Sequence, residues 1–226
     1  MSQDLKVAVA KQAVESLQWQ GVIGVGTGST VNAWLDELAQ QGVQLGTAVA
    51  SSEATADRLR AMGVRVVDLN GTDVALYVDG ADEFNRFGQL IKGGGGALTR
   101  EKIIAAAARR FVVLADKHKS VSRLGVGHPL PIEVIPMARG YVARECIKMG
   151  GQPIYREGVV TDNGNVILDV HRLPMNEPMK TDAALNQIVG VVCHGLFTRP
   201  TPDLILCAHS VDHVAQITAE SNDASR

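Results

Sequence analysis

The segment KGGGGALTRE, residues 92–101, places a lysine, four consecutive glycines and a glutamate close together in the chain. Consecutive glycines lose much conformational entropy on folding and bury no side chain, so stability alone does not favour them. They allow the backbone to approach another group closely. Glu101 by itself is explained as an acid that complements a helix dipole. That explanation leaves the glycines and Lys92 unexplained, so we expect this segment to line a binding site.

A second polar stretch, GVGTGST at residues 24–30, joins an apolar run to a helical pattern. Backbone N–H groups, a helix N-terminus and the hydroxyls of Thr27, Ser29 and Thr30 suit a phosphate. No GK[ST] follows, so the stretch is not a Walker loop, and Ser29 stands where a dinucleotide fingerprint needs its third glycine. The alternative is a tight turn with a hydroxyl cap, and this stretch alone leaves both possibilities open.

Carboxylates gather in the DGADE stretch, where Asp79 ends an apolar run and Asp82 and Glu83 follow within one turn. Such a cluster can hold sugar hydroxyls, share protons or bind a metal ion, and the alternative is a solvated acidic turn. The nearby SSEAT stretch, residues 51–55, adds hydroxyls, although Ser51 or Ser52 is explained equally well as a helix N-cap.

Metal-ligand and disulfide patterns are weak elsewhere in the chain. Cys193–His194 and the pair His209 and His213 lack the acidic neighbours of a zinc motif, so we interpret them as structural or surface groups. The three cysteines include no CxxC pair, which favours free thiols in a reducing compartment.

The elements that must position these groups alternate in the first half of the chain. Nearly all-apolar strands alternating with helices predict a parallel sheet covered on both faces, a doubly wound, Rossmann-like α/β domain. The polar stretches then fall at the carboxyl ends of strands, where such sheets bind ligands. The predicted strands are 22–26, 47–50, 64–69, 74–79 and 111–116, and the predicted helices are 4–18, 29–40, 53–62 and 99–110.

The pattern changes near GVGHPLPIEVIP, where prolines and glycines mark a boundary. Beyond it a βαββαβ order with a TDNGN hairpin turn predicts an inserted ferredoxin-like α+β domain. Its predicted strands are 131–135, 153–157, 165–171 and 191–197, and its helices are 137–149 and 179–188.

The chain is expected to return to the first domain after the insert. DLILCA at 203–208 predicts one more buried strand, a short helix is expected to about residue 219, and SNDASR is expected to be a frayed tail. The predicted domains are 1–128 plus 202–220 and 129–201.

Composition excludes several classes of protein. The formal net charge is −2 and no long basic run is present, so neither nucleic acid nor a membrane surface is an expected partner. The first 20 residues lack the uninterrupted apolar core of a signal peptide, and no segment has the roughly 20 apolar residues of a membrane span. These features favour a cytoplasmic protein.

Five stretches in order, GVGTGST, SSEAT, DGADE, KGGGGALTREK and VVTDNGNVILDV, resemble the ribose-5-phosphate isomerase type A family. The similarity runs over nearly the whole chain, and the first four stretches show no departure. The resemblance implies interconversion of ribose 5-phosphate and ribulose 5-phosphate without a metal or other cofactor. It also implies a homodimer or larger homo-oligomer.

The resemblance also implies roles for individual residues. Glu101 corresponds to the general base, and Asp79, Asp82 and Lys92 correspond to groups lining the catalytic site. Further substrate contacts are implied for Thr27, Gly28, Ser29, Thr30, Gly80, Ala81, Gly93, Gly94, Gly95 and Lys119.

Two other functions remain open from the residues alone. A non-catalytic sugar-phosphate sensor would need a DNA-binding or partner module, and neither a helix-turn-helix extension nor a basic patch is visible. A dinucleotide oxidoreductase is disfavoured by Ser29 in the glycine-rich turn.

Overall fold

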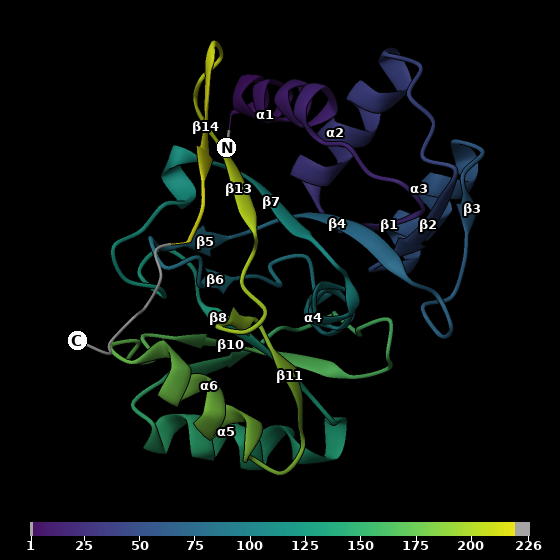
Figure 1. The fold of residues 1–226 in the computed structure, drawn as a ribbon. Helices are drawn as coiled ribbons and strands as arrows, with labels where there is room; N and C mark the ends of the chain where they lie inside the picture. Colours follow the sequence, from purple (N-terminus) through teal and green to yellow (C-terminus); the bar gives the residue numbers. More distant parts are fainter. Residues whose placement is uncertain (1, 220–226) are drawn as a thin grey trace. The chain divides into compact units, whose positions relative to one another are not determined.

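The computed structural model describes residues 2–219 of the chain (Figure 1). Its compact units are Met1–Ala81 with Arg100–Lys119 and Pro202–Arg226, and Asp82–Thr99 with Ser120–Thr201. The predicted domain boundaries, 1–128 plus 202–220 and 129–201, stay a prediction. The units differ from them by assigning residues 82–99 and 120–128 to the second part.

A seven-stranded sheet forms the centre of the first unit, in the order β14-β13-β7-β4-β1-β2-β3. All neighbouring strands are parallel except β13 and β14. This is the Rossmann strand order, whose direction reverses between β1 and β4, so the predicted fold class is confirmed. The strands are β1 (Val22–Val25), β2 (Thr47–Ala50), β3 (Arg65–Val66), β4 (Val74–Gly80), β7 (Phe111–Asp116), β13 (Leu204–Ser210) and β14 (His213–Ile217).

Helices α1 (Gln3–Ser16) and α2 (Ser29–Gln40) pack against each other and against one face of this sheet (Figure 1). Their apolar side chains share a core cluster with Leu76 and Val78 of β4. Side chains alternate along a strand, so Tyr77 and Asp79 point to the opposite face.

Helix α4 (Leu98–Ala107) packs on that opposite face. A Cβ added at Gly24 of β1 would lie 2.7 Å from Cγ2 of Ile104 and 2.8 Å from Cδ2 of Tyr77. The absence of a side chain at Gly24 therefore lets Ile104 of α4 and the ring of Tyr77 pack against β1. Helix α3 (Glu53–Ala61) contacts β2 and β3.

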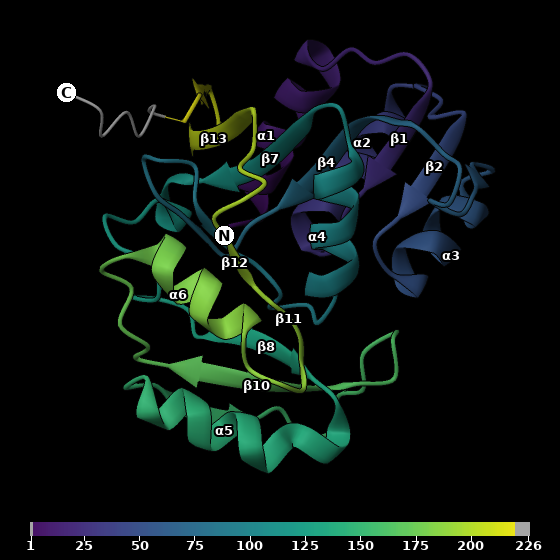
Figure 2. The ribbon, with the colours of Figure 1, turned by 60° about the horizontal axis from the view of Figure 1, so that its bottom comes forward.

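The second unit contains a four-stranded antiparallel sheet in the order β11-β8-β10-β9. Figure 2 shows its helices from a second side, and both contribute to one apolar core cluster with β8 and β10. The predicted βαββαβ order and its hairpin are confirmed. The elements are β8 (Leu130–Val134), α5 (Arg139–Lys148), β9 (Gln152–Tyr155), β10 (Val166–His171), α6 (Pro178–Asn186) and β11 (Val191–His194).

A small third sheet was not predicted. It joins β5 (Glu83–Phe84), β6 (Leu90–Ile91) and β12 (Leu196–Phe197). The predicted strand 191–197 is thus two strands separated at Gly195, whose N–H donates to the Pro131 carbonyl. Strands of two residues carry too little periodicity to be read from the sequence.

The predicted helix ending near residue 219 is wrong. Residues 213–217 form β14, which pairs antiparallel with β13 through a tight reversal in which Ser210 lies opposite His213. Antiparallel pairing needs only such a short turn, and partly buried Val214 packs on the core of the first unit. The predicted strand 64–69 is shorter than expected, because only Arg65 and Val66 pair at this edge of the sheet. The SNDASR tail lies outside the described residues.

Within residues 2–219, no helix has both the length and the apolar character that crossing a membrane requires.

Candidate functional site

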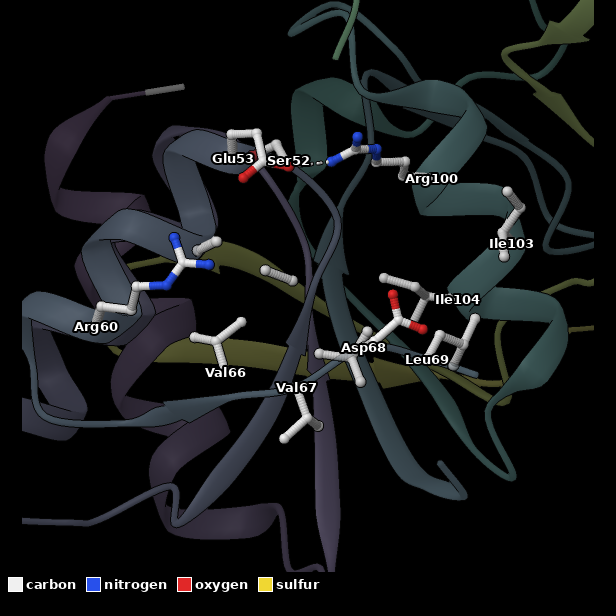
Figure 3. Close-up of a pocket in the computed structure, with 13 residues that line it drawn as sticks. Ser52, Glu53, Arg60, Val66, Val67, Asp68, Leu69, Arg100, Ile103 and Ile104 are labelled. Carbon is white, nitrogen blue, oxygen red and sulfur yellow. Dashed lines mark hydrogen bonds and ion pairs between the residues drawn. The ribbon is translucent and has the colours of Figure 1, made fainter. Parts of the chain in front are cut away.

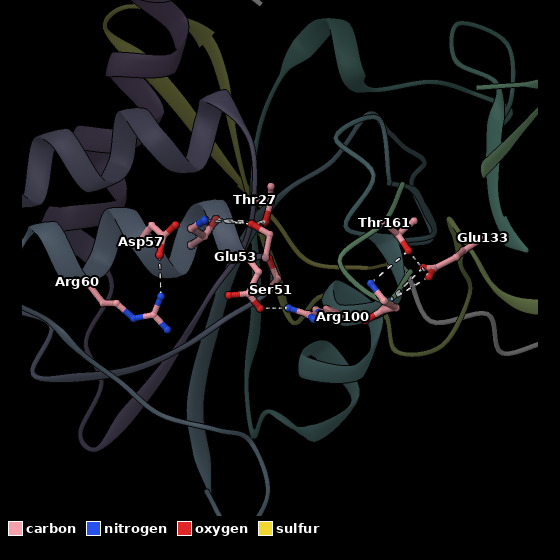
Figure 4. Close-up of polar contacts among 11 residues, drawn as sticks. Thr27, Ser51, Glu53, Asp57, Arg60, Arg100, Glu133 and Thr161 are labelled. Atoms are coloured by element: carbon pink, nitrogen blue, oxygen red, sulfur yellow. Dashed lines mark hydrogen bonds and ion pairs between the residues drawn. The ribbon is translucent and has the colours of Figure 1, made fainter. Parts of the chain in front are cut away.

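Hydroxyl groups from two of the predicted stretches meet in the first unit. The Thr27 hydroxyl lies 2.7 Å from Oγ of Ser51, 2.8 Å from Oγ of Ser52 and 3.2 Å from Oγ1 of Thr55. Figure 4 shows Thr27 and Ser51 facing each other from the ends of their strands. Ser52 is also the N-cap of α3, accepting the Thr55 N–H at 3.1 Å, so the predicted capping role is confirmed. The Thr27 hydroxyl is therefore held by the protein itself.

Asp79 is fully buried at the end of β4. Its Oδ1 accepts the N–H of Gly80 at 2.7 Å and that of Thr27 at 3.2 Å. Its Oδ2 accepts the hydroxyl proton of Tyr77. A Cβ added at Gly26 would lie 2.0 Å from Oδ1, so a glycine is needed where the turn passes this carboxylate.

The N-terminus of α2 carries no side-chain cap. Its N-cap residue is Gly28, with φ of +118°, and Ser29 and Thr30 open the helix. The first N–H groups of a helix have no intrahelical acceptor, and the helix dipole favours an anion near them. This end of α2 lies directly after β1, at the point where strand order reverses, and suits a phosphate group.

Glu101 stands in the first turn of α4, as predicted, and only 3 % of the residue is exposed. The charge of Glu101 acts on the hydroxyl group of Tyr77. Burial raises the pKa of Tyr77 well above its usual value, and the charges of Asp79 and Glu101 raise that pKa further. Two carboxylates thus share one buried environment on this face of the sheet.

Lys119 follows the end of β7 in a short 3-10 turn, Lys117–Lys119. The sequence analysis missed Asp116 at the last position of the same strand. Asp116 is fully buried, and its Oδ2 has no hydrogen-bond partner among residues 2–219. In the sequence, the signal for Asp116 is an acid at the end of the otherwise apolar run FVVLAD.

In the second unit, Lys92 lies just after β6 and is only 2 % exposed. Its backbone N–H donates to the Gly195 carbonyl at 2.9 Å, and its Nζ lies 5.7 Å from the centre of the Phe197 ring. An ammonium group at this distance from the face of an aromatic ring is attracted to it by a cation–π interaction.

Two of the glycines after Lys92, Gly93 and Gly94, lie close to other groups of the protein itself. Gly93 has φ of +101°, and an added Cβ there would lie 2.9 Å from Cβ of Leu98. The Gly94 N–H donates to Oδ2 of Asp82 at 2.8 Å, and an added Cβ would lie 2.9 Å from Oδ1. The backbone N–H of Gly94, which was expected to face a ligand, is therefore hydrogen-bonded to Asp82, itself a predicted site residue. The residues Gly94 and Gly95 are nevertheless exposed to solvent.

Arg156 holds the carbonyl side of this glycine loop. Its Nη1 donates to the carbonyls of Gly93 and Gly94 at 3.1 and 3.2 Å. Its other nitrogens form a two-pronged pair with Asp169 at 2.8 and 2.5 Å. The side chains are 18 % and 17 % exposed, so the pair is mostly shielded from water. The sequence analysis did not single out either residue.

Replacing Asp169 with asparagine is expected to lower the free energy of unfolding by about 1–3 kcal/mol, because the charge-assisted hydrogen bonds to Arg156 are lost. Chemical denaturation measures the change. Lys180→Ala is the control, since Lys180 and Glu177 pair on the surface with 77 % and 63 % exposure and contribute at most about 1 kcal/mol. Equal losses in both variants would contradict a structural role for the Arg156–Asp169 pair.

Residues of the TDNGN turn donate hydrogen bonds to the buried carboxylate of Glu133. Glu133 is fully buried and accepts hydrogen bonds from Thr161 at 2.8 Å and from Asn165 at 2.8 Å (Figure 4). It also accepts the hydroxyl proton of Thr99. The type and position of Thr99 suggest an N-cap, but Thr99 lies inside α4, because the helix begins one residue earlier, at Leu98.

Glu83 does not belong to a metal site. Its carboxylate accepts the backbone N–H groups of Gly125 at 2.6 Å, Gly127 at 2.5 Å and His128 at 2.8 Å. In the alternative interpretation of DGADE as a metal site, Glu83 would be one of the oxygen ligands. Its carboxylate is instead occupied by these three backbone N–H groups. In the part of the chain that the structure describes, no group of three or more His, Cys, Asp or Glu residues is placed to hold a metal ion.

A pocket of about 470 Å³ lies in the first unit beside α3 and α4 (Figure 3). Its walls include Val66, Ile104 and the pair Glu53–Arg100, which are 2.7 Å apart. Ser52, one of the hydroxyl groups around Thr27, also lines it, whereas none of the residues with an implied catalytic or substrate-binding role does.

The cysteines are free thiols, as expected. Burial raises the pKa of Cys146 and of Cys207 to about 11, and the neighbouring charges of Glu145 and Asp116 contribute. Neither thiol is ionised near neutral pH, so neither is suited to be a nucleophile.

The Rossmann strand order, the uncapped helix at the reversal point and the buried carboxylates define a doubly wound α/β protein whose strand ends suit a small anionic ligand. Residues 47–211 match the family model described as ribose 5-phosphate isomerase A (phosphoriboisomerase A). The chain belongs to the ribose 5-phosphate isomerase A family. Its activity is that of the family, the interconversion of ribose 5-phosphate and ribulose 5-phosphate.

Solved structures agree with this assignment over nearly the full length. Ribose 5-phosphate isomerase A from Neisseria gonorrhoeae is 41 % identical with a TM-score of 0.91, covering 97 % of this chain and 98 % of its own. The enzyme from Methanocaldococcus jannaschii is 35 % identical with a TM-score of 0.88, covering 96 % and 100 %. A D-ribose-5-phosphate isomerase in complex with phospho-erythronic acid is 32 % identical with a TM-score of 0.89, covering 96 % and 100 %.

Proposed function

We propose that the isomerisation proceeds by proton transfer through an enediolate, with Glu101 as the general base. In the open-chain aldose, Glu101 takes the proton from C2, and the C1 carbonyl becomes part of an enediolate. The same carboxyl group then returns the proton to C1 while the hydroxyl proton passes from O2 to O1, which leaves a ketone at C2 and a hydroxyl group at C1. The observation that carries this proposal is the buried position of Glu101 on the face of the sheet that also holds Asp79.

Lys92 is the proposed stabiliser of the enediolate. Negative charge develops on the sugar oxygens only as the proton leaves carbon, and a fixed cation in a site shielded from water lowers the energy of that state. Its burial supports this role, because a shielded ammonium acts in a low dielectric.

Asp79 and Asp82 are proposed to accept hydrogen bonds from sugar hydroxyls and to assist opening of the furanose ring. Gly80 and Ala81 lie between them in the chain and form the backbone beside the sugar. Asp79 is held by three donors, which supports a role that demands a fixed orientation.

The phosphate is proposed to bind at Thr27–Thr30 and at Lys119, with Gly93–Gly95 also contacting the substrate. Ser29 and Thr30 open α2, and the first N–H groups and the dipole of that helix favour an anion there. A relative that is 32 % identical binds phospho-erythronic acid, which carries both a phosphate and a carboxylate. That ligand supports a site combining an anion pocket with groups that stabilise a second negative charge.

The chain is also proposed to act in the cytoplasm as a homodimer or larger homo-oligomer. This rests on the family alone. Sedimentation equilibrium of the purified chain measures the assembly directly.

The proposed chemistry predicts that activity survives exhaustive chelation. Ribose 5-phosphate is added to the purified chain in excess EDTA, and ketose formation is followed. Full activity is expected, because Lys92 provides the positive charge that a Lewis acid would otherwise supply. Loss of activity that Mg²⁺, Mn²⁺ or Zn²⁺ restores would favour metal-assisted transfer and would require new roles for Lys92 and Asp79.

A further inference from the structure

We propose that Tyr77 is a positioning residue that closes a ring of hydrogen bonds around Asp79 and so fixes the orientation of that carboxylate during isomerisation. Neither the residue types nor the five recognised stretches singled out Tyr77, which lies inside the apolar strand β4. The proposal rests on the role given to Asp79 above.

The ring joins three of the polar stretches. The Tyr77 hydroxyl donates to Oδ2 of Asp79, and a hydrogen bond links it to the Ser51 hydroxyl. Oγ of Ser51 lies 2.7 Å from Oγ1 of Thr27, and the Thr27 N–H returns to Oδ1 of Asp79 at 3.2 Å. Movement of any one member therefore disturbs both oxygens of the carboxylate.

The ring of Tyr77 is held in position by its packing. Tyr77 is fully buried and stacks on Phe111 of β7, with ring centres 5.2 Å apart and an interplanar angle of 24°. Only a glycine at position 24 leaves room beside it, because an added Cβ there would lie 2.8 Å from Cδ2. The hydroxyl is thus aimed at Asp79 by contacts along the whole side chain.

The charges around Tyr77 keep it a donor. Asp79 from β4 and Glu101 from α4 are the charged groups that act on it, and Ser51 is the neutral partner. Burial, then Asp79 and then Glu101 raise its pKa well above the usual value, so the phenol stays protonated where the enzyme works. Tyr77 therefore supplies one fixed proton to Asp79 beside the proposed base and does not itself act as a base.

Loss of the Tyr77 hydroxyl is expected to affect the rate of the chemical step and substrate affinity differently. Removing the hydroxyl takes one hydrogen-bond donor from Oδ2 of Asp79 and one hydrogen bond from Ser51, while the end of α2 proposed to bind phosphate is unchanged. A small misplacement of a group that orients the reacting atoms lowers the rate of chemistry strongly. Substrate affinity, which depends largely on the phosphate, is expected to change little.

The test is Tyr77→Phe, which keeps the aromatic ring and removes only the hydroxyl. We expect kcat to fall about 10- to 100-fold with KM within about twofold. Leu76→Ala is the control, since Leu76 is the buried neighbour of Tyr77 in β4 and packs in the core on the opposite face of the sheet. It is expected to lower the melting temperature while kcat stays within about threefold. A wild-type kcat in Tyr77→Phe, or losses of kcat that follow the melting temperature in both variants, would overturn the proposal.

Asp79→Asn and the double variant distinguish the proposal from the assignments on which it rests. If Tyr77 acts through Asp79, the double variant Tyr77→Phe/Asp79→Asn is no slower than Asp79→Asn alone. Multiplying losses would show that Tyr77 acts independently and would overturn the proposal. Full activity in Asp79→Asn would instead reject the role of Asp79, and with it the positioning role of Tyr77, while leaving the isomerase activity standing.

Discussion

Replacing Glu101 with glutamine is expected to lower kcat by about 10²- to 10⁴-fold and to leave substrate binding nearly unchanged. Glutamine keeps the shape of the side chain and loses the ability to take a proton from carbon. Steady-state kinetics give kcat, and calorimetric titration with ribose 5-phosphate gives the dissociation constant. A kcat near the wild-type value would remove Glu101 from its proposed role.

Glu53→Gln is the matched control for this variant. Glu53 occupies the first turn of α3 as Glu101 occupies the first turn of α4, so both acids complement a helix dipole. The dipole effect of either acid is worth only about 0.3–1 kcal/mol of stability. Glu53→Gln is therefore expected to retain kcat within about twofold. Similar losses in both variants would favour the helix-dipole explanation of Glu101.

Replacing Lys92 with alanine is expected to lower kcat by about 10²- to 10³-fold, with a much smaller rise in KM. The ammonium meets its full opposing charge only in the enediolate, so its loss affects the transition state more than the bound substrate. Steady-state kinetics measure both constants. Far-ultraviolet circular dichroism of the variant checks that the fold survives removal of this buried charge.

Lys119→Ala and Thr30→Ala provide the contrast. Both residues are proposed to contact the phosphate, which carries the same charge before and after the chemistry. Their replacement is expected to raise KM and to change kcat little, because such binding is uniform between ground state and transition state. The division of roles would be wrong if Lys92→Ala, Lys119→Ala and Thr30→Ala gave one kinetic pattern.

The elements that carry the polar stretches were predictable because each has a strong local pattern. FVVLAD is apolar up to its last residue, Asp116, and is buried throughout, which is typical of a central parallel strand. The change from helix–strand alternation to a βαββαβ order was equally visible in the sequence. Ser52 as N-cap and Glu101 in a first helical turn also followed from local chemistry.

Features that depend on contacts between distant residues were not predictable in this way. HVAQI forms a strand because β13 offers an edge to pair with, and no local pattern reveals that partner. Tyr77 reads as one more core residue of an apolar strand, and only the fold shows its hydroxyl at Asp79. The close neighbours of Gly93 and Gly94 belong to Leu98 and Asp82, whereas the sequence alone suggested a ligand.

The fate of the hydrogen on C2 tests the central claim most directly. Ribose 5-phosphate deuterated at C2 is incubated with the wild-type chain and with Glu101→Gln in ordinary water, and loss of the label from the sugar is followed by mass spectrometry. The carboxyl group exchanges part of the abstracted proton with water before it returns a proton to C1. Proton transfer through Glu101 therefore predicts that the wild-type chain releases part of the label to the solvent, and that the variant releases it at least about 100-fold more slowly. Complete retention of the label in the wild-type product, or release by Glu101→Gln at the wild-type rate, would contradict the account.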